Sequence, residues 1–414
     1  MTRRPLTPAL SPNSVGREGV TRPDLLARAS AAHAQRAEQD LLRRLRVVED
    51  ATATQVVIDG RTLQNFASND YLGLAQHPAV RDAALRAIAR WGVGATAAHL
   101  LGGHRAEHAA LEEKLAQWTG RDRALLFSTG YMANLGVLGA LLHDGDLCVQ
   151  DKLNHACLLD GARLSGAELK RYGHADVAGA ARQLRSRPDA AALLASDGVF
   201  SMDGDIAPLM DIAALCKKER AMLMIDDAHG IGVLGTDGAG SVSAAGLDQD
   251  DVPVLMATLG KALGVAGAFV AGSGALIDGL VQFARTYVFT TAMPPALAAA
   301  ASAAIDVVCF EPWRRVKLQR LIAHFRHGAM AREITLLDSQ TAIQPVPTGD
   351  SAAALRASQH LEHAGFYVPA IRPPTVPANT ARLRVTLSAA HEESDVEQLL
   401  DALARALRAV RDTN

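Results

Sequence analysis

The sequence of 414 residues has few cysteines, few lysines and no long hydrophobic run. No apolar stretch approaches the roughly 20 residues that a membrane helix needs. The first 20 residues contain arginine but no apolar segment, so they do not match a secretory signal. The four cysteines are scattered without a Cys-x-x-Cys pair, and we expect free buried thiols in a reducing compartment: Cys148, Cys157, Cys216 and Cys309. These absences predict a cytoplasmic protein without a membrane partner.

The sequence also lacks an excess of positive or negative charge. The formal net charge is −2, and the sequence has no long block of like charges, which argues against a nucleic-acid partner. Only seven of the 42 basic residues are lysines, so any lysine chemistry has few candidates. Hydrophobic residues make up 49% of the chain, enough for a sizeable core in two lobes.

The central part of the chain alternates short apolar runs with longer helical patterns. This rhythm is typical of βαβ units and of a mostly parallel sheet that is buried on both faces. Ligands bind such sheets at the carboxyl ends of the strands. The runs that predict strands are 124–127, 147–150, 192–196, 221–225, 254–258 and 268–272.

The flanking regions have other patterns. Residues 24–46 predict a helix, and a hairpin is expected around Asp59-Gly60. A long Ala-rich helix is expected from about 296 into PWRRVKLQRLIAHFRHG, followed by a smaller α+β region. The predicted organisation is an N-terminal extension with a helix and hairpin (1–70), a large domain (71–309) and a small C-terminal α+β domain (310–414).

Two formal motifs fit their chemistry poorly. GIGVLG (230–235) matches GxGxxG and follows a strand, but TDGAGSVSAAG after it does not predict the helix that a dinucleotide site requires. HRAEH (104–108) matches an inverted zinc motif, which leaves a metallohydrolase as a distant alternative. No obvious third ligand follows it, and a charged helix start is the competing interpretation. We therefore expect no metal site.

Three other features fit one cofactor together. STGYMAN (128–134) opens a helix after a strand, which suits a phosphate. The strand at 221–225 ends at Asp226 and Asp227, one of which could hold a ring nitrogen protonated. Lys261 follows the next strand among small residues, without a carboxylate neighbour in sequence, where burial would lower its pKa as a Schiff-base lysine needs. The combination predicts pyridoxal 5′-phosphate, without deciding which aspartate serves.

At this point the sequence resembles the α-oxoamine synthases, and seven stretches spread over the chain carry the resemblance. It implies an α/β fold of the aspartate aminotransferase-like class (pyridoxal-phosphate fold type I). Such a fold has a large domain with a mostly parallel seven-stranded sheet, a smaller α+β C-terminal domain and homodimers with shared sites. The stretches are SNDYLGL (68–74), ALLFSTGYMAN (124–134), LNHACLLDGARLS (153–165), GVFSMDGDIAPL (198–209), IDDAHGIGVLG (225–235), TLGKALG (258–264) and TTAMPP (290–295).

The resemblance also implies a role for each matching position. Lys261 would bond to the cofactor aldehyde and later act as a base, Asp226 would pair with the ring nitrogen, and His155 would stack on the ring. Asp227 would be a structural neighbour, and TTAMPP would reach the phosphate of a neighbouring subunit. The other implied cofactor contacts are Gly130, Tyr131, Ser201, His229 and Thr258. Arg384 would bind the substrate carboxylate, and Arg43, Asn69, His155 and Thr375 match substrate-contacting positions.

Within the family, IRPPTVPANTARLRVTLSAAH (371–391) is similar to the member that condenses L-alanine with a pimeloyl thioester in biotin synthesis. The resemblance leaves open whether coenzyme A or acyl-carrier protein carries the acyl group. Sister reactions of glycine or serine with other acyl thioesters, and a non-catalytic subunit that lacks the lysine, are the alternatives. The chain departs from the family at Asn379, where glycine is usual, and in the less Gly/Ser-rich segment 92–103.

Overall fold

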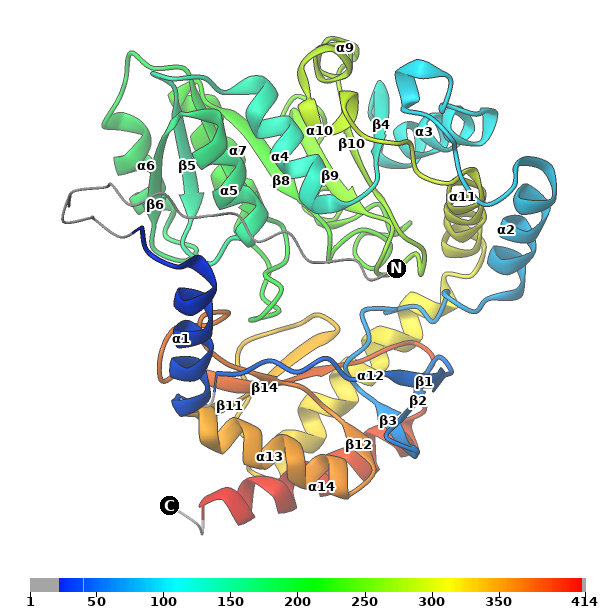
Figure 1. The fold of residues 1–414 in the computed structure, drawn as a ribbon, viewed down its shortest axis with the longest axis vertical. Coiled ribbons are helices and arrows are strands. Elements are labelled where there is room, and N and C mark those ends of the chain that lie inside the picture. Colours follow the sequence, from blue (N-terminus) through cyan, green and yellow to red (C-terminus); the bar gives the residue numbers. More distant parts are fainter. Residues whose placement is uncertain (1–21, 40, 412–414) are drawn as a thin grey trace, which may run out of the picture. The chain divides into compact units, whose positions relative to one another are not determined.

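A computed structural model describes residues 22–39 and 41–411, in two compact units, 1–45 and 46–414. The described part of the first unit contains α1 (Leu25–Glu38), which begins at the cap residue Asp24, whose Oδ1 accepts the Leu26 N–H at 2.8 Å (Figure 1, blue). The prediction of a helix over 24–46 was wrong beyond residue 38. No residue of α1 is buried, so no tertiary packing extends the helix beyond residue 38.

The second unit is built on a seven-stranded sheet in the order β4-β10-β9-β8-β7-β5-β6. Only β10 runs antiparallel to its neighbours, which confirms the mostly parallel sheet. All six predicted strands are present, and β6 was missed because ELKRY is a polar, half-exposed edge strand. The strands are β4 (Arg123–Phe127), β5 (Leu147–Asp151), β6 (Glu168–Tyr172), β7 (Ala192–Asp197), β8 (Met222–Asp226), β9 (Val254–Thr258) and β10 (Ala268–Gly272).

Helices cover both faces of this sheet (Figure 1). Successive strand residues alternate between the faces, so that Met256 packs with the core under α4, α5 and α9, whereas Leu255 packs with the core under α6 and α7. The helices of this layer are α2 (Pro78–Trp91), α3 (Ala106–Thr119), α4 (Gly130–Leu141), α5 (Ala156–Ser165), α6 (Val177–Arg185), α7 (Leu209–Glu219), α8 (Ser241–Ala244), α9 (Gly274–Phe283), α10 (Arg285–Val288) and α11 (Pro295–Phe310), with the 3₁₀ helix η1 (His99–Leu101).

Two small sheets complete the unit, in the orders β1-β2-β3-β12 and β11-β14-β13. The predicted hairpin is confirmed as β2 and β3, with Asp59 and Gly60 both at positive φ in its turn. The parallel pairing of β3 with β12 joins this early hairpin to the C-terminal region. The elements are β1 (Val48–Ala51), β2 (Gln55–Ile58), β3 (Arg61–Asn65), β11 (Ile343–Gly349), β12 (Phe366–Tyr367), β13 (Ala370–Ile371), β14 (Ala381–Thr386), α12 (Trp313–Ala331), α13 (Ser351–His363) and α14 (Glu393–Arg411).

The expected long Ala-rich helix is broken in two. The chain bends by 72° between α11 and α12, next to Pro312, which lacks the N–H that a continuous helix would use. Among the described residues no single helix is long and apolar enough to cross a membrane; only this bent pair passes by length and composition, and α11 is largely buried in the core. Three cysteines are buried as predicted, but Cys309 near the end of α11 is exposed, contrary to the prediction.

Candidate functional site

The candidate site lies at the carboxyl edge of the seven-stranded sheet. Asp197, Asp226 and Thr258 are the last residues of the adjacent strands β7, β8 and β9, and Asp197 and Asp226 are register partners. Lys261 follows Thr258 by three residues. Because the carboxyl ends of parallel strands meet at one edge, residues far apart in sequence come together here.

Lys261 has the features of a reactive amine. Its Nζ lies 2.7 Å from His229 Nε2. Burial lowers the pKa of Lys261 to about 8, although the charges of Asp226 and Asp197 act in the opposite direction. Lys261 has no carboxylate neighbour along the chain, but the fold brings the charges of Asp226 and Asp197 near it. The expected direction of the pKa shift nevertheless holds, since burial outweighs both charges.

The structure distinguishes the two acids that the sequence could not. Asp226 faces the site, where its Oδ2 accepts a 2.7 Å hydrogen bond from the Asn134 side chain and its Oδ1 accepts the Ala228 N–H. Asp227 instead binds Ser241, accepting its N–H at 2.7 Å and its hydroxyl at 2.6 Å. Burial raises the pKa of Asp227 to about 7, against the effect of these hydrogen bonds.

The glycines after His229 accommodate Asp227. A Cβ on Gly230 would lie 2.1 Å from Asp227 Oδ1, and one on Gly240 would lie 1.9 Å from Oδ2, so neither position accepts a side chain. No helix begins within GIGVLG, and the next one, α8, starts at Ser241. The segment is therefore a tight loop around a buried carboxylate. The sequence predicted no helix directly after GIGVLG, and the structure has none there.

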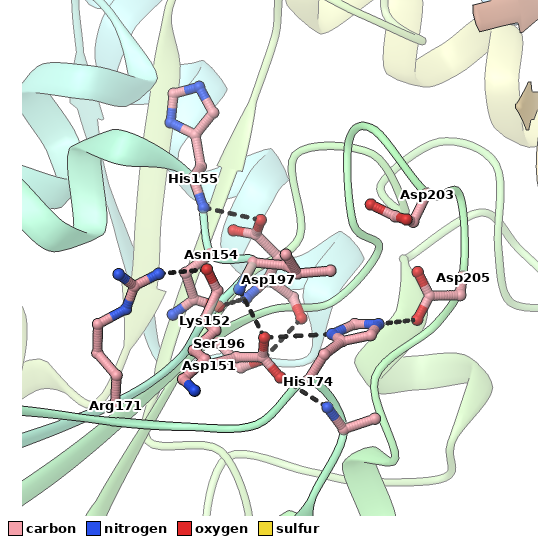
Figure 2. A network of polar contacts seen from close by, with 12 residues as sticks. Asp151, Lys152, Asn154, His155, Arg171, His174, Ser196, Asp197, Asp203 and Asp205 are labelled. Atoms are coloured by element: carbon pink, nitrogen blue, oxygen red, sulfur yellow. Dashed lines mark hydrogen bonds and ion pairs between the residues drawn. The ribbon is translucent and has the colours of Figure 1, made fainter. Parts of the chain in front are cut away.

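His155 is the N-terminal cap residue of α5 and contacts two neighbours, Asp197 and Cys157. Its backbone N–H donates to Asp197 Oδ2 at 3.0 Å, as Figure 2 shows. Its Nδ1 lies 2.8 Å from Cys157 Sγ. Asn134 donates to the same sulfur and to Asp226, so the helix-start histidine and the strand-end acid share one hydrogen-bonded group. Burial raises the pKa of Cys157 to about 12 and keeps it a thiol.

The loop that carries Ser201 is held from both sides. His174 lies between Asp151 on β5 (3.2 Å) and Asp205 in the loop (2.8 Å), as Figure 2 shows. These two carboxylates raise the pKa of His174 to about 10 against the effect of burial, which keeps the imidazolium charged. From the small sheet, Arg384 donates from Nε to the Ser201 carbonyl at 2.8 Å, and Arg382 binds Asp203 at 2.6 Å.

The start of α4 presents backbone N–H groups beside the strand ends. Gly130 and Tyr131 are its first residues, and Thr129 caps it by accepting the Met132 N–H. A Cβ on Gly130 would meet Met256 and Ala268 at ordinary contact distance. Thr258 accepts the Gly260 N–H and donates to the Gly267 carbonyl, which fixes the turn before Lys261.

The remaining predicted residues divide into two groups. Asn69 joins the site, because its Oδ1 accepts both Arg384 Nη groups, at 3.3 and 3.2 Å. Thr375 lies in an exposed turn after β13, and Arg43 belongs to the first unit, so their roles stay predictions. Asn379, where the family usually has glycine, has φ 61, a positive value that asparagine tolerates better than most residues.

Sequence reasoning missed three residues of the site: Asn134, Tyr71 and Asp197. Asn134 was detectable as the polar residue in an otherwise apolar helix start, and it is fully buried against Asp226. Tyr71 binds His229 Nδ1 at 2.6 Å, a contact across 158 positions that no local pattern announces. Asp197 ends a strand just as Asp226 does, and its Oδ1 has no hydrogen-bond partner among the described residues.

The motif HRAEH has a different environment. His104 and His108 come together with His99, a residue upstream that the search for a third ligand did not consider. Both ring nitrogens of His108 are used: Nδ1 accepts the Arg105 N–H at 2.8 Å, and Nε2 donates to the Met293 carbonyl at 2.8 Å. These bonds favour the interpretation of HRAEH as the start of α3, with His108 as part of its cap.

The assembled groups can do covalent amine chemistry on an anionic ligand. They comprise an amine with a lowered pKa, a carboxylate at a strand end, a helix N-terminus and a buried arginine with a bidentate fork. A model of the family Aminotransferase class I and II matches residues 61–403, so the chain belongs to this family. Individual relatives whose names are known indicate a narrower class within this family.

The chain is 53% identical over 378 residues to the 8-amino-7-oxononanoate synthase of Cellvibrio japonicus (strain Ueda107), covering 91% of this chain and 95% of that protein. It is 56% identical over 368 residues to the 8-amino-7-oxononanoate synthase of Hahella chejuensis (strain KCTC 2396), covering 89% and 93%. Among solved structures, a serine palmitoyltransferase variant from S. paucimobilis with a bound PLP-myriocin aldimine superposes with a TM-score of 0.89 at 30% identity, covering 94% of this chain and 100% of that one.

Proposed function

We propose that this chain condenses L-alanine with a pimeloyl thioester, giving 8-amino-7-oxononanoate, CO2 and the free thiol, in biotin synthesis. The observation that carries the proposal is the Lys261 amine, with a pKa near 8, beside the Asp226 carboxylate in a chain more than half identical to synthases of that name. A cytoplasmic homodimer, with TTAMPP (290–295) near a second subunit's site, belongs to the same proposal.

The residues present fit pyridoxal phosphate. Lys261 offers an amine for the aldehyde, and Asp226 offers an anion for the ring nitrogen. The start of α4 would offer the backbone N–H groups of Gly130 and Tyr131 to the phosphate. His229 and Ser201 would contact the phenolic side of the ring, Thr258 the phosphate, and His155 the ring face. When bound, the cofactor would supply an aldehyde carbon and a ring that withdraws electrons from the amino acid Cα.

The chain's own residues would orient the amino acid and move its proton. Arg384 would bind the alanine carboxylate with its fork, displacing the Asn69 oxygen that now accepts from it. The free Lys261 amine would remove the Cα proton, and its low pKa keeps a useful fraction unprotonated near neutral pH. Acylation of Cα by the thioester would release the thiolate, which would take a proton from water, and the carboxylate would depart as CO2 from the Arg384 seat. The Lys261 ammonium would then return its proton to Cα.

A substrate matrix tests the proposal. Alanine, glycine and serine are each combined with pimeloyl, acetyl, succinyl and palmitoyl thioesters, and products are identified by mass spectrometry. Alanine with the pimeloyl thioester should give the highest kcat/KM. Preference for serine with palmitoyl thioester, the pair suggested by the name of the solved neighbour, would refute the assignment, and so would preference for a glycine reaction.

The same matrix addresses the acyl carrier and the non-catalytic alternative. Pimeloyl groups on coenzyme A and on acyl-carrier protein are compared side by side, because nothing in the described site distinguishes them. A non-catalytic subunit would show no product in any well and no visible chromophore after addition of pyridoxal phosphate. The presence of Lys261 predicts the opposite on both counts.

A further inference from the structure

A line of three hydrogen bonds joins Asp226 to the ring of His155 through two buried residues. Asn134 Nδ2 lies 2.7 Å from Asp226 Oδ2 and 2.9 Å from Cys157 Sγ. The same sulfur lies 2.8 Å from His155 Nδ1. Asn134 is 0% exposed and Cys157 is 2% exposed, so the inner contacts are shielded from water. The line connects the end of β8 to the start of α5 by way of α4.

The hydrogens along this line follow from the partners of each atom. The Asp226 carboxylate only accepts, so Asn134 uses one amide hydrogen there and the other on the sulfur. Burial raises the pKa of Cys157 to about 12, so the sulfur keeps its own hydrogen, for which His155 Nδ1 is the acceptor. The Cys157 backbone N–H also donates to Nδ1, at 3.4 Å, as part of the cap of α5. Two donors directed at one ring nitrogen leave that nitrogen without a hydrogen.

A neutral His155 therefore carries its hydrogen on Nε2. Figure 2 shows the ring pointing away from Asp197, whose contact with the backbone N–H does not decide which ring nitrogen carries the hydrogen. Among the described residues no atom accepts from His155 Nε2, and the residue is exposed. In this form the histidine is set to donate a hydrogen bond to an oxygen of a ligand and not to act as a base.

We propose that Cys157 is a positioning residue whose thiol hydrogen, with its backbone N–H, holds His155 in the Nε2–H form, so that the histidine presents a donor to a substrate oxygen. The inference rests on the proposed function, which places His155 on the ring face next to the substrate. None of the three contacts in the line involves Lys261, so the arrangement is the same whether the lysine amine is free or bonded.

The first test reads the position of the hydrogen directly and needs no change at Cys157. Nitrogen-15 spectra of the full chain with labelled histidine, recorded without cofactor on the alkaline side of the histidine titration, distinguish a ring nitrogen that carries hydrogen from a bare one. The variant His155→Gln assigns the signals. We expect hydrogen on Nε2 and a bare Nδ1, and hydrogen on Nδ1 in the unmodified chain would overturn the inference.

Variants at Cys157 test whether the thiol is responsible. Cys157→Ala removes the thiol hydrogen, whereas Cys157→Ser supplies a hydroxyl that can accept and donate in its place. Because a donor to the bare nitrogen opposes its protonation, the midpoint of the His155 titration should rise by about half a unit in Cys157→Ala, an about threefold higher proton affinity. Cys157→Ser should keep the midpoint of the unmodified chain. The charged groups beside His155 are the same in every variant: Asp197, Asp226 and Lys261.

Cys148→Ala is the matched control, because it removes another buried thiol, whose sulfur accepts from the Gln150 amide at 3.3 Å. It should leave the His155 midpoint unchanged. In the loaded enzyme, Cys157→Ala should lower kcat/KM for alanine by about tenfold, the scale of one hydrogen bond, and the other two variants should stay within about threefold. An unchanged midpoint in Cys157→Ala, or equal losses in Cys157→Ala and Cys157→Ser, would overturn the inference alone, whereas absence of condensation by the unmodified chain would refute the proposed function.

Discussion

Two clusters in this molecule contain bases with a lowered pKa, but they use their polar atoms differently. The lysine cluster (Lys261, His229 and Asp226) lies at the carboxyl edge of the central sheet, and the histidine cluster (His99, His104 and His108) lies at the start of α3. Burial lowers the pKa of each base in both clusters. In the histidine cluster, His108 uses both ring nitrogens within the protein.

Some polar atoms in and beside the lysine cluster have no hydrogen-bond partner among the described residues. Lys261 makes one short contact through Nζ, and the buried oxygens Asp197 Oδ1 and Asn134 Oδ1 have no hydrogen-bond partner among the described residues. A native protein seldom leaves buried polar atoms unsatisfied without a reason, and a bound ligand is one such reason. A lowered pKa therefore accompanies burial in both clusters. An unpartnered buried oxygen also occurs beside the histidine cluster, at Glu107 Oε2, so what distinguishes the lysine cluster is that such atoms lie next to an amine.

The largest expected effect is at Lys261. Lys261→Ala should lower the condensation rate by about a thousandfold or more, because both the covalent attachment and the base are lost. The visible chromophore of the loaded protein should disappear with it. Lys218→Ala, at an exposed position, is the matched control. Normal turnover in Lys261→Ala would show that the reaction does not depend on Lys261, and the lysine cluster would then not differ from the histidine cluster in function.

Asp226 and Asp227 should separate catalysis from stability. Asp226→Asn should lower kcat by about a hundredfold, since an amide cannot balance a protonated ring nitrogen. Asp227→Asn should keep kcat within about threefold but lower the unfolding free energy by about 1–3 kcal/mol, through the disturbed Ser241 hydrogen bonds. Kinetics and urea unfolding of both variants provide the measurement, and exchanged phenotypes would contradict the assignment.

The histidine cluster should affect how the free energy of unfolding depends on pH in the acid range. Burial lowers the pKa of His99 to about 4, whereas an unfolded histidine titrates near 6.5. Because the folded pKa is depressed, the stability that neutral His99 contributes is complete above pH 6.5 and is lost as the pH falls towards 4. Between pH 7 and 5 this amounts to about 2 kcal/mol at most.

The variant His99→Asn should lose that part of the pH dependence in urea unfolding. His143→Asn, at an exposed histidine, should keep it. An identical slope in His99→Asn and in the unmodified chain would show that His99 does not titrate in this range.

The smallest effect is expected at His108. His108→Gln keeps an acceptor at the third position of α3, so the cap should survive, with a loss of less than about 1 kcal/mol and unchanged kcat. Dialysis against a chelator should leave the melting temperature unchanged. A large drop on chelation, abolished in His108→Gln, would instead support the zinc interpretation of HRAEH.

Much of this architecture could be predicted from local patterns. The six apolar runs became strands, and the Asp59-Gly60 pair became the hairpin turn, because burial on both faces and positive φ leave clear signals in composition. The polar edge strand β6 and the end of α1 were not predicted. An edge position and a lack of packing leave only weak signals in the composition of the sequence. Of the residues implied by the family resemblance, the structure brings Lys261, Asp226, His229, Asn69 and Arg384 together.

The sequence by itself determined the order of strands and helices and the few residue types able to do amine chemistry, because those depend on neighbours along the chain. Only the tertiary structure decided that Asp226 faces the site while Asp227 turns to Ser241, and that Tyr71 reaches His229 across 158 positions. The physical reason is that such contacts form where separate strand ends converge, and their geometry is set by packing that no local pattern records.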